Sequence, residues 1–304
     1  MGQIHQLILN KGRQAARDMV ATKHEKSLID VAAQFLAEEE EHIGITHSGF
    51  CLTALPHKAT ELLTWRREGY RCTLVIQSGV DRQEMSVGLP FGSKARMILL
   101  YLQTQAVRTR SPVVELGGSM HRWLETMGLS IGGNTYRQVA EQALRISRCR
   151  LTFFWDGDAG SVELNGGFVK TAIRPSPAKA DSNQPSLWRE TVELDEAFYQ
   201  ELLRHPVPLS ENALKAISGK SMALDIYIWL AYRLHAIEQE TPISWPSVHR
   251  QFGAGFAHLR QFKPEFIRNL QLAMAVYPEA RVSVEESGLI LRPSKSPIRA
   301  LSRS

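Results

Sequence analysis

The sequence ARMILLYLQTQAV (95–107) opens an order of helices and strands that the chain repeats about 128 residues later. The apolar residues of this stretch recur at spacings of one, three and four, as in Ile98, Leu99, Leu102 and Ala106. Such spacings place apolar side chains on one face of an α-helix. The stretch therefore predicts an amphipathic helix that packs on a core.

The residues that follow complete the first copy of this order. PVVELG (112–117) is typical of a short strand, and two helices are expected at 119–129, with Ser119 as N-cap, and at 134–148. CRLTFFW and VELNGGFVKTAI then flank the turn DGDAGS, so 149–173 predicts a β-hairpin.

The second copy has the same order of elements. MALDIYIWLAYRLHAI (222–237) predicts the first helix, TPISW a short extended segment, and PSVHRQFG (246–253) the next helix, with Pro246 at its first position. A longer helix at about 263–278 precedes ARVSVEESGLILRP (280–293), which predicts strand, turn and strand. The shift of 128 residues also aligns His121-Arg122 with His249-Arg250.

Helix, strand, helix, helix and hairpin is the order of a winged-helix module. In such a module the third helix enters the major groove of DNA and the hairpin touches the backbone. The sequence therefore predicts an α+β fold with two tandem winged-helix domains and an N-terminal helical extension.

The remaining segments set the expected domain boundaries. Helical periodicity in KSLIDVAAQFLAEEEEH indicates a helical extension over 1–45, whereas GFCLTALPH (49–57) and YRCTLVIQSG (70–79) are interpreted as strands that extend the first sheet. Pro, Ser and charged residues indicate a linker, and WRETVEL indicates a strand after it. The expected domains are 1–45, 46–174 (first winged helix), 175–187 (linker), 188–293 (second winged helix) and 294–304 (basic tail).

Each third helix has an apolar stripe and a polar face. In 134–148 the stripe is formed by Tyr136, Val139, Ala140, Ala143 and Ile146, and the other side carries Asn134, Arg137, Gln138, Glu141, Arg145 and Arg148. In the second copy the stripe is Phe262, Phe266, Leu270, Ala273 and Tyr277, which leaves Arg260, Lys263, Arg268 and Asn269 for solvent or DNA. Arginine and amide side chains are the groups that recognise guanine and adenine edges.

Positive charge is concentrated toward the C-terminus. The formal net charge is +5, yet residues 1–90 carry 10 Lys and Arg against 11 Asp and Glu. Residues 246–304 carry 9 basic and 4 acidic residues. This distribution suits the neutralisation of DNA phosphates. Arg292 begins a basic, Pro- and Ser-rich end that is expected to be disordered, and it is interpreted either as a solvated tail or as an arm that grasps DNA.

Other classes of protein are disfavoured by what the sequence lacks. Cys51, Cys72 and Cys149 are widely spaced, so they indicate neither a disulfide framework nor a zinc site, and they suit a reducing cytoplasm. No signal peptide or membrane span is expected, and no phosphate-binding loop is present. None of the ten histidines forms the His-hydrophobic-His motif of nicking enzymes. We therefore expect no catalytic residues, metal or cofactor.

Single residues that could suggest catalysis have simpler interpretations. Tyr101 and Tyr136 lie in apolar stripes, which favours packing over a nucleophilic role. Asp156 and Asp158 stand in DGDAG, which is typical of a turn. The aligned His121 and His249 are interpreted as helix-surface or phosphate-side residues rather than as metal ligands.

Several ordered segments resemble the RepA-type replication initiators encoded by bacterial plasmids. They are LPFGSKARMILLYLQTQAVRT (89–109), ELGGSMHRWLETMGL (115–129), GGNTYRQVAEQALRI (132–146), HPVPL (205–209), ALDIYIWLAYRL (223–234) and AVYPEARV (275–282). The resemblance implies two winged-helix domains that bind repeated origin sequences called iterons. It also implies local origin melting, recruitment of a host initiator ATPase and a replicative helicase, and a homodimeric form.

The resemblance also implies a division of labour between the two modules. It makes Arg260, Lys263, Arg268 and Asn269 the base-reading candidates, and Arg137, Arg145 and Arg148 the phosphate candidates. Further DNA-binding candidates are Gln138, His249, Arg250 and Arg292. A continuous helix from Leu259 is not expected to tolerate Pro264; if the helix starts at Lys263 instead, Arg260 lies in the preceding turn.

The expected function is therefore non-enzymatic binding of double-stranded origin DNA by a cytoplasmic plasmid replication initiator. Two alternatives stay open. The first is a transcriptional repressor with the same fold, which would bind an operator. An initiator that also represses its own promoter would combine both activities. A nicking-type initiator would cut DNA and need a divalent ion.

Overall fold

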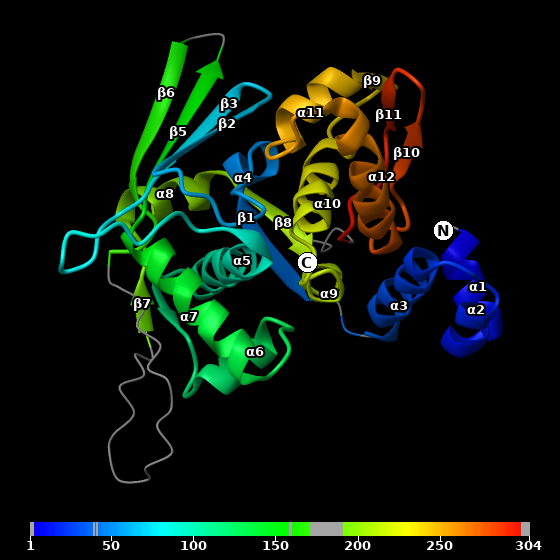
Figure 1. Cartoon of the computed structure of the whole chain (residues 1–304), viewed down its shortest axis with the longest axis horizontal. Helices are drawn as coiled ribbons and strands as arrows, with labels where there is room; N and C mark the ends of the chain where they lie inside the picture. The colour runs from blue at the N-terminus through cyan, green and yellow to red at the C-terminus, as the bar shows by residue number, and fades with distance from the viewer. Residues whose placement is uncertain (1–2, 39, 41, 158–159, 171–190, 299–304) are drawn as a thin grey trace, which may run out of the picture. The chain divides into compact units, whose positions relative to one another are not determined.

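The computed structural model describes residues 3–38, 40, 42–157, 160–170 and 191–298 (Figure 1). The contacts divide the chain into two compact units. Unit 1 combines Met1–Gly44 with Pro208–Ser304, and unit 2 is Ile45–Val207. Helices and strands occur in both units, so the α+β class is confirmed. In the part of the chain that is described, no helix is long and apolar enough to cross a membrane.

Unit 2 contains the first copy of the repeated order of elements. Its helices are α4 (Ser48–Leu52), α5 (Gly92–Thr109), α6 (Met120–Thr126), α7 (Gly133–Arg148) and α8 (Glu196–Arg204). Its strands are β2 (Thr64–Gly69), β3 (Cys72–Gln77), β4 (Val113–Glu115), β5 (Arg150–Gly157), β6 (Gly160–Gly167) and β7 (Thr191–Glu193). From α5 to β6 the predicted order of helix, strand, helix, helix and hairpin is confirmed.

An antiparallel sheet in the order β2-β3-β5-β6 supports the helices of unit 2. Alternate residues of its central strands are buried, and Leu74 faces Phe153 while Ile76 faces Leu151 across the β3–β5 ladder. The expected strand at 70–79 is therefore confirmed as β3, and it extends the sheet of the hairpin.

The expected strand at 49–57 is wrong, because Ser48–Leu52 forms the short helix α4. Its first turn is held locally: the Gly49 amide donates to Nδ1 of His47, and the Thr53 amide donates to the Gly49 carbonyl. An apolar run without strict alternation fits a buried helical turn as well as a strand.

The short strand after the first helix pairs differently in the two copies. In unit 2, β4 pairs with β7 and leaves the β5–β6 hairpin to join β3. In unit 1 the corresponding strand, β9 (Thr241–Ser244), pairs with β11 (Gly288–Arg292) of the hairpin. The two copies thus share the order of elements and differ in sheet topology.

Unit 1 contains the second copy together with the N-terminal helices. Its helices are α1 (Gln3–Lys11), α2 (Arg13–Asp18), α3 (Lys23–Ala37), α9 (Glu211–Ala216), α10 (Ser221–Arg233), α11 (Trp245–Phe252) and α12 (Leu259–Ala275). Its sheet has the order β10-β11-β9, with β10 at Arg281–Val284. The chain passes between the units within β1 (Ile43–His47) and β8 (Pro206–Ser210).

Aromatic side chains form the core of unit 1 around the central helix α10. Tyr227 of α10 lies edge-on to Tyr277 with ring centroids 6.2 Å apart, and both are fully buried. Phe266 of α12 packs against Phe252 of α11 and edge-on to Trp245. These rings hold α11 and α12 together and so position the outer face of α12.

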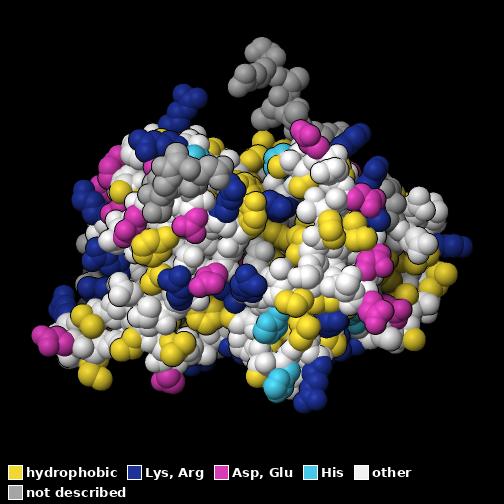
Figure 2. Space-filling model, turned by 90° about the horizontal axis from the view of Figure 1, so that it is seen from above, with side chains coloured by type: hydrophobic (Ala, Val, Ile, Leu, Met, Phe, Trp, Pro, Cys, Tyr) yellow, Lys and Arg dark blue, Asp and Glu magenta, His cyan; other side chains and the backbone are white. Residues whose placement is uncertain are grey.

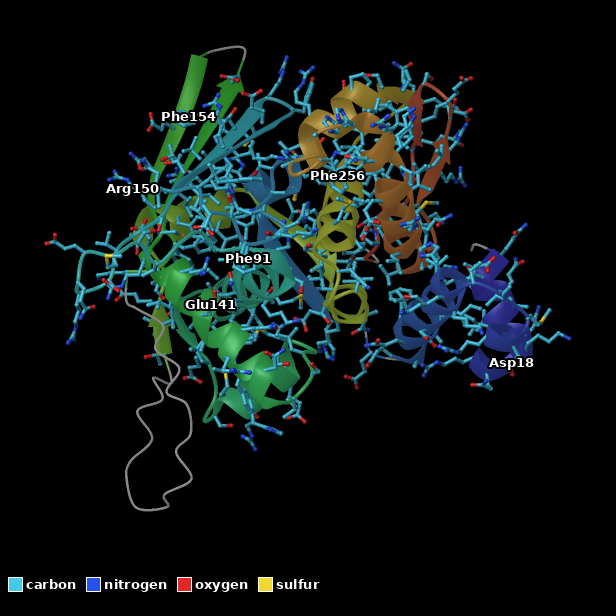
Figure 3. The ribbon with its side chains drawn as sticks, in the orientation of Figure 1. Asp18, Phe91, Glu141, Arg150, Phe154 and Phe256 are labelled. Atoms are coloured by element: carbon cyan, nitrogen blue, oxygen red, sulfur yellow. The ribbon has the colours of Figure 1, made fainter. Side chains whose placement is uncertain are left out.

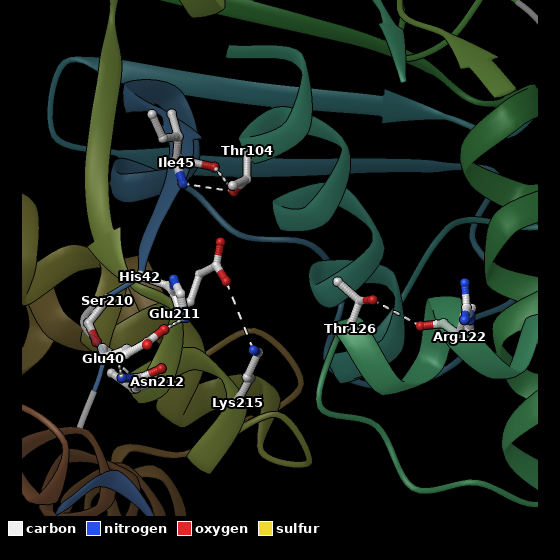
Figure 4. A network of polar contacts seen from close by, with 11 residues as sticks. Glu40, His42, Ile45, Thr104, Arg122, Thr126, Ser210, Glu211, Asn212 and Lys215 are labelled. Carbon is white, nitrogen blue, oxygen red and sulfur yellow. Dashed lines mark hydrogen bonds and ion pairs between the residues drawn. The ribbon is translucent and has the colours of Figure 1, made fainter. Parts of the chain in front are cut away.

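The N-terminal helices pack within unit 1 rather than standing apart, although we expected residues 1–45 to form a separate section. Leu28, Ile29 and Ala32 of α3 are buried where α3 meets α12 and α9. The segment after α3 is tied to α9 as well (Figure 4): the Glu40 carbonyl accepts from Nδ2 of Asn212 at 2.7 Å. Apolar burial and this hydrogen bond account for the grouping.

Two other boundaries also differ from the expected ones. The stretch 191–207 groups with unit 2, since β7 pairs there with β4. Residues 294–298 of the expected basic tail are packed: the Ser294 amide donates to the Leu234 carbonyl, and Ile298 is buried. Residues 299–304 and the expected linker 175–187 lie outside the described residues.

Candidate nucleic-acid interface

The outer face of α7 carries the predicted polar row of unit 2. Val139, Ala143 and Ile146 are buried beneath it, as the apolar spacing predicted. The exposed side chains are Asn134, Arg137, Gln138, Glu141, Leu144 and Arg148. The surface position of Arg137, Gln138 and Arg148 is thus confirmed, and their contact with DNA stays a prediction.

Arg145 does not belong to this exposed row. Its Nη1 donates to the Leu89 carbonyl at 3.0 Å and its Nη2 to Glu141 at 2.7 Å. The guanidinium lies 5.0 Å from the ring centroid of Phe91, which precedes α5 (Figure 3). Only 18% of the side chain is exposed. The prediction that Arg145 faces solvent as a phosphate contact is wrong, because these contacts hold the segment before α5 against α7.

The helix α12 begins at Leu259 and contains Pro264, so the expectation that a continuous helix from Leu259 could not hold this proline is wrong. The missing amide of Pro264 would have bonded to the Arg260 carbonyl. Arg260 is exposed and lies in the first turn of the helix. The helix loses this hydrogen bond at Pro264, and Arg260 stays on the helix.

Asn269 is turned inward, against the prediction that it remains available to solvent or DNA. It is 7% exposed, and its Nδ2 donates to the Glu265 carbonyl at 2.9 Å and to the Glu265 carboxylate at 3.0 Å. The neighbouring Arg268 is exposed, and among the contacts described it has an ion pair to Glu265 at 3.1 Å. Exposed pairs of this kind are weak, so Arg268 is available for a stronger anionic partner.

Lys263 is half-buried and joins α12 to the hairpin of unit 1. Its Nζ lies 5.0 Å from the ring centroid of Trp245 and donates to the Glu286 carbonyl at 3.4 Å. Nε1 of Trp245 donates to the neighbouring Glu285 carbonyl at 3.1 Å. The side chains of Glu285 and Glu286 are exposed at the hairpin turn. Carboxylates repel phosphate, so this turn is poorly suited to the backbone contact expected of a wing.

The remaining candidates of unit 1 divide into one exposed residue and two that contact the fold. Arg250 of α11 is exposed. His249 is half-buried, with Nε2 donating to the Phe256 carbonyl at 3.0 Å and the ring edge-on to Phe262, so it is not the surface residue that we expected. Arg292 donates to Glu240 at 2.6 Å and to the Ser283 hydroxyl.

Gln261 is a surface residue of α12 that the sequence analysis missed. It is exposed one position after Arg260, and the amide of glutamine recognises adenine in the same way as that of asparagine. The signal was present, because Gln261 stands outside the apolar stripe. It was overlooked because the helix was expected to start near Lys263.

The tyrosines weighed as nucleophiles have other partners. The Tyr101 hydroxyl donates to the Glu115 carbonyl at 2.6 Å, and burial raises the pKa of Tyr101. The Tyr136 hydroxyl lies 3.3 Å from Nδ1 of the exposed His121. Within the described residues no cluster of His, Cys, Asp or Glu is arranged to hold a metal ion.

Basic and acidic side chains are interspersed on the face drawn in Figure 2. The exposed basic candidates group by helix. The row on α12 consists of Arg260, Gln261 and Arg268, and the row on α7 of Arg137, Gln138 and Arg148.

Comparison with known proteins identifies the family. Residues 89–246, which run from the segment before α5 into α11, match the family described as plasmid encoded RepA protein. The chain belongs to this RepA family. It is therefore a RepA-type replication initiator, a class of DNA-binding protein, as the resemblance of its ordered segments predicted.

Solved structures add a likeness of fold, whereas no curated protein matches the RepA chain. A crystal structure of domains 2 and 3 of RctB aligns with a TM-score of 0.50 at 14% identity, over 82% of this chain and 95% of that one. A second structure of RctB domains 2–3 aligns with a TM-score of 0.48 at 13% identity, over 79% and 93%. The first likeness extends over both units of the RepA chain and concerns the fold alone.

Proposed function

We propose that this RepA protein binds repeated sequences, or iterons, in the double-stranded DNA of a plasmid origin through two winged-helix modules. It then opens the neighbouring DNA and recruits a host initiator ATPase and a replicative helicase. Membership of the RepA family supports the role in initiation. The exposed row Arg260, Gln261 and Arg268 on α12 is the observation that carries the proposal for sequence reading.

In this proposal α12 lies in the major groove and α7 contacts the backbone. Arginine recognises guanine through two parallel hydrogen bonds, and glutamine recognises adenine in the same way. Arg260 and Gln261 lie in the first turn of α12, the part of a recognition helix that approaches the bases. Arg137 and Arg148 on α7 supply phosphate contacts, which carry little sequence information.

The proposed mechanism involves no cleavage of DNA. Binding at successive sites bends or untwists the duplex, and the strain is relieved by melting of a neighbouring AT-rich segment. The Tyr101 hydroxyl donates to the Glu115 carbonyl, which supports a packing role for this tyrosine, one of the two considered as nucleophiles. Incubation of the protein with supercoiled plasmid and Mg²⁺ is expected to leave the plasmid closed. A nicked plasmid with covalently attached protein would overturn this part.

The replication role is tested by a plasmid that carries the gene and its flanking DNA as its only origin in the host. The wild-type protein is expected to maintain this plasmid, and the double variant Arg260→Ala/Arg268→Ala to lose it. Arg204→Ala is the matched control, since Arg204 is exposed on α8 and pairs only with Glu201 among the contacts described. Promoter repression without maintenance would show a repressor instead.

A further inference from the structure

The α12 row extends further along the exposed face of the helix, through Pro264 to Gln271. Arg260, Pro264, Arg268 and Gln271 are separated by four, four and three positions, which places them one above another on a helix. All four are exposed. The next position of the row is Ala275, which is only 4% exposed. Something therefore covers the carboxyl end of this face.

The N-terminal helices provide the cover. Nε2 of His5 in α1 donates to the Ala275 carbonyl at 2.8 Å, in a buried contact. Nε2 of His24, near the start of α3, lies 2.7 Å from Oε1 of Gln271. These contacts place the beginning of α3 at the end of the row. A duplex that follows the row along α12 therefore meets the first turn of α3.

The charge of α3 is distributed unevenly along its length. Lys23 is exposed and Lys26 half-exposed near its beginning, whereas Glu38 and Glu40 are exposed beyond its end. Glu25 is the acidic residue of the first turn, and its carboxylate accepts from the amide and hydroxyl of Thr22 at 2.9 and 2.7 Å. Only the beginning of α3 thus presents basic side chains suited to an anionic partner.

We propose that the beginning of α3 is part of the DNA interface, with Lys23 and Lys26 contacting phosphates that border the groove entered by α12. The inference rests on the proposed function and extends its footprint to the N-terminal helices. Continuity with the α12 row gives the position, and the lysines give the charge complementarity. The acidic end of α3 repels the duplex and so fixes on which side of the helix DNA passes.

The first test compares Lys23→Gln with Lys215→Gln. Lys215 lies on α9, where its Nζ is 3.9 Å from Glu211, and it is outside the proposed contact, so it controls for the loss of one lysine charge. The probe is a duplex made from the DNA next to the gene, and its affinity is measured by fluorescence anisotropy at several salt concentrations. Lys23→Gln is expected to weaken binding roughly two- to fivefold. It should also lower the slope of log affinity against log salt by about 0.9.

Lys23→Arg is expected to restore both values, and Lys215→Gln to equal the wild type. If Lys23→Gln has the affinity and salt slope of the wild type, Lys23 does not touch phosphate. If Lys215→Gln loses as much as Lys23→Gln, the effect is one of net charge. Either result overturns the inference.

The second test maps the contact directly with a DNA-cleaving iron chelate attached at Lys23→Cys. The native cysteines are buried, so the introduced thiol is the one labelled. Cleavage is expected at the edge of the site bound by α12, and none from the same label at Lys215→Cys. Binding without cleavage from position 23 overturns this inference alone. If the wild-type protein does not bind the duplex at all, the proposed function fails and this inference falls with it.

Discussion

Replacing Arg145 with alanine is expected to destabilise unit 2 while leaving the DNA-facing side of α7 intact. The substitution removes a charged hydrogen bond to the Leu89 carbonyl, worth about 1.5–3 kcal/mol in general. It also removes the contact with the ring of Phe91, worth about 1 kcal/mol. The partly exposed pair with Glu141 adds about 0.3–0.5 kcal/mol. Because such terms are not additive, we expect a loss of about 3 kcal/mol.

Thermal unfolding followed by circular dichroism measures this loss. For a unit of this size a loss of 1 kcal/mol lowers Tm by about 2–4 °C, so a decrease of about 6–12 °C is expected. Hydrogen exchange should also become faster in residues 79–91. Arg145 packs closely on this segment: a Cβ at Gly88, whose backbone is left-handed, would lie 2.7 Å from Nη1 of Arg145.

Arg148→Ala is the matched control three residues further along α7. Arg148 is exposed, so its removal is expected to change stability by less than about 0.5 kcal/mol and to lower DNA affinity on every sequence tested. The reasoning is refuted if Arg145→Ala unfolds at the wild-type temperature while it loses DNA affinity as Arg148→Ala does.

Three further predictions concern other parts of the chain. Arg268→Ala should weaken specific DNA binding, measured by fluorescence anisotropy, by roughly 1–3 kcal/mol with little change in Tm. Asn269→Ala should instead lower Tm, because it breaks the hydrogen bonds to Glu265. A lower Tm for Arg268→Ala and weaker DNA binding for Asn269→Ala would contradict the two assignments. Burial, with a smaller effect of His205, lowers the pKa of His47 from 6.5 to about 4. The folded protein therefore favours the neutral imidazole. The resulting stability is fully present above pH 6.5 and is lost as the pH falls toward 4. Denaturant unfolding at several pH values should show about 3 kcal/mol of this dependence, and an unchanged pH dependence in His47→Gln would assign it to other groups. Burial raises the pKa of Cys72 and Cys149 to about 12, so a thiol reagent at pH 8 should react with neither until the protein unfolds, and rapid reaction of the native protein would contradict their burial.

The order of elements could be predicted from the sequence because it depends on local spacing. Apolar residues at helical intervals located α5, α7, α10 and α12, and the turns located both hairpins. Each signal lies within a single element. The same kind of signal failed at Ser48–Leu52, where a short apolar run fits a helical turn as well as a strand.

Pairing between distant segments could not be predicted in this way. Whether a short strand pairs with the hairpin, as β9 does, or with a later strand, as β4 does, depends on the whole sheet. The docking of α3 on α12 likewise joins residues such as His24 and Gln271, which are far apart in the chain. The periodicity of α3 predicted a helix and carried no information about its partner.

The sequence predicted correctly which candidate residues are exposed where helical periodicity alone determines exposure. Arg137, Gln138, Arg260 and Arg268 are on the surface because they lie opposite an apolar stripe. Periodicity places Arg145 on the same side of the helix, yet its guanidinium contacts the Leu89 carbonyl and the Phe91 ring. Asn269 is at the edge of the stripe, where its short side chain reaches Glu265 of the same helix. Arg145 was assigned wrongly because its partners are distant in the sequence, and Asn269 because its short side chain bonds within its own helix.

The most direct test of the central proposal is a footprint of the purified protein on the DNA that flanks its own gene, in physiological salt with excess nonspecific competitor. Regularly spaced protection over direct repeats is the expected result, and it should disappear in Arg260→Ala/Arg268→Ala. Protection of a single inverted repeat over the promoter, or none at all, would contradict an initiator that binds iterons.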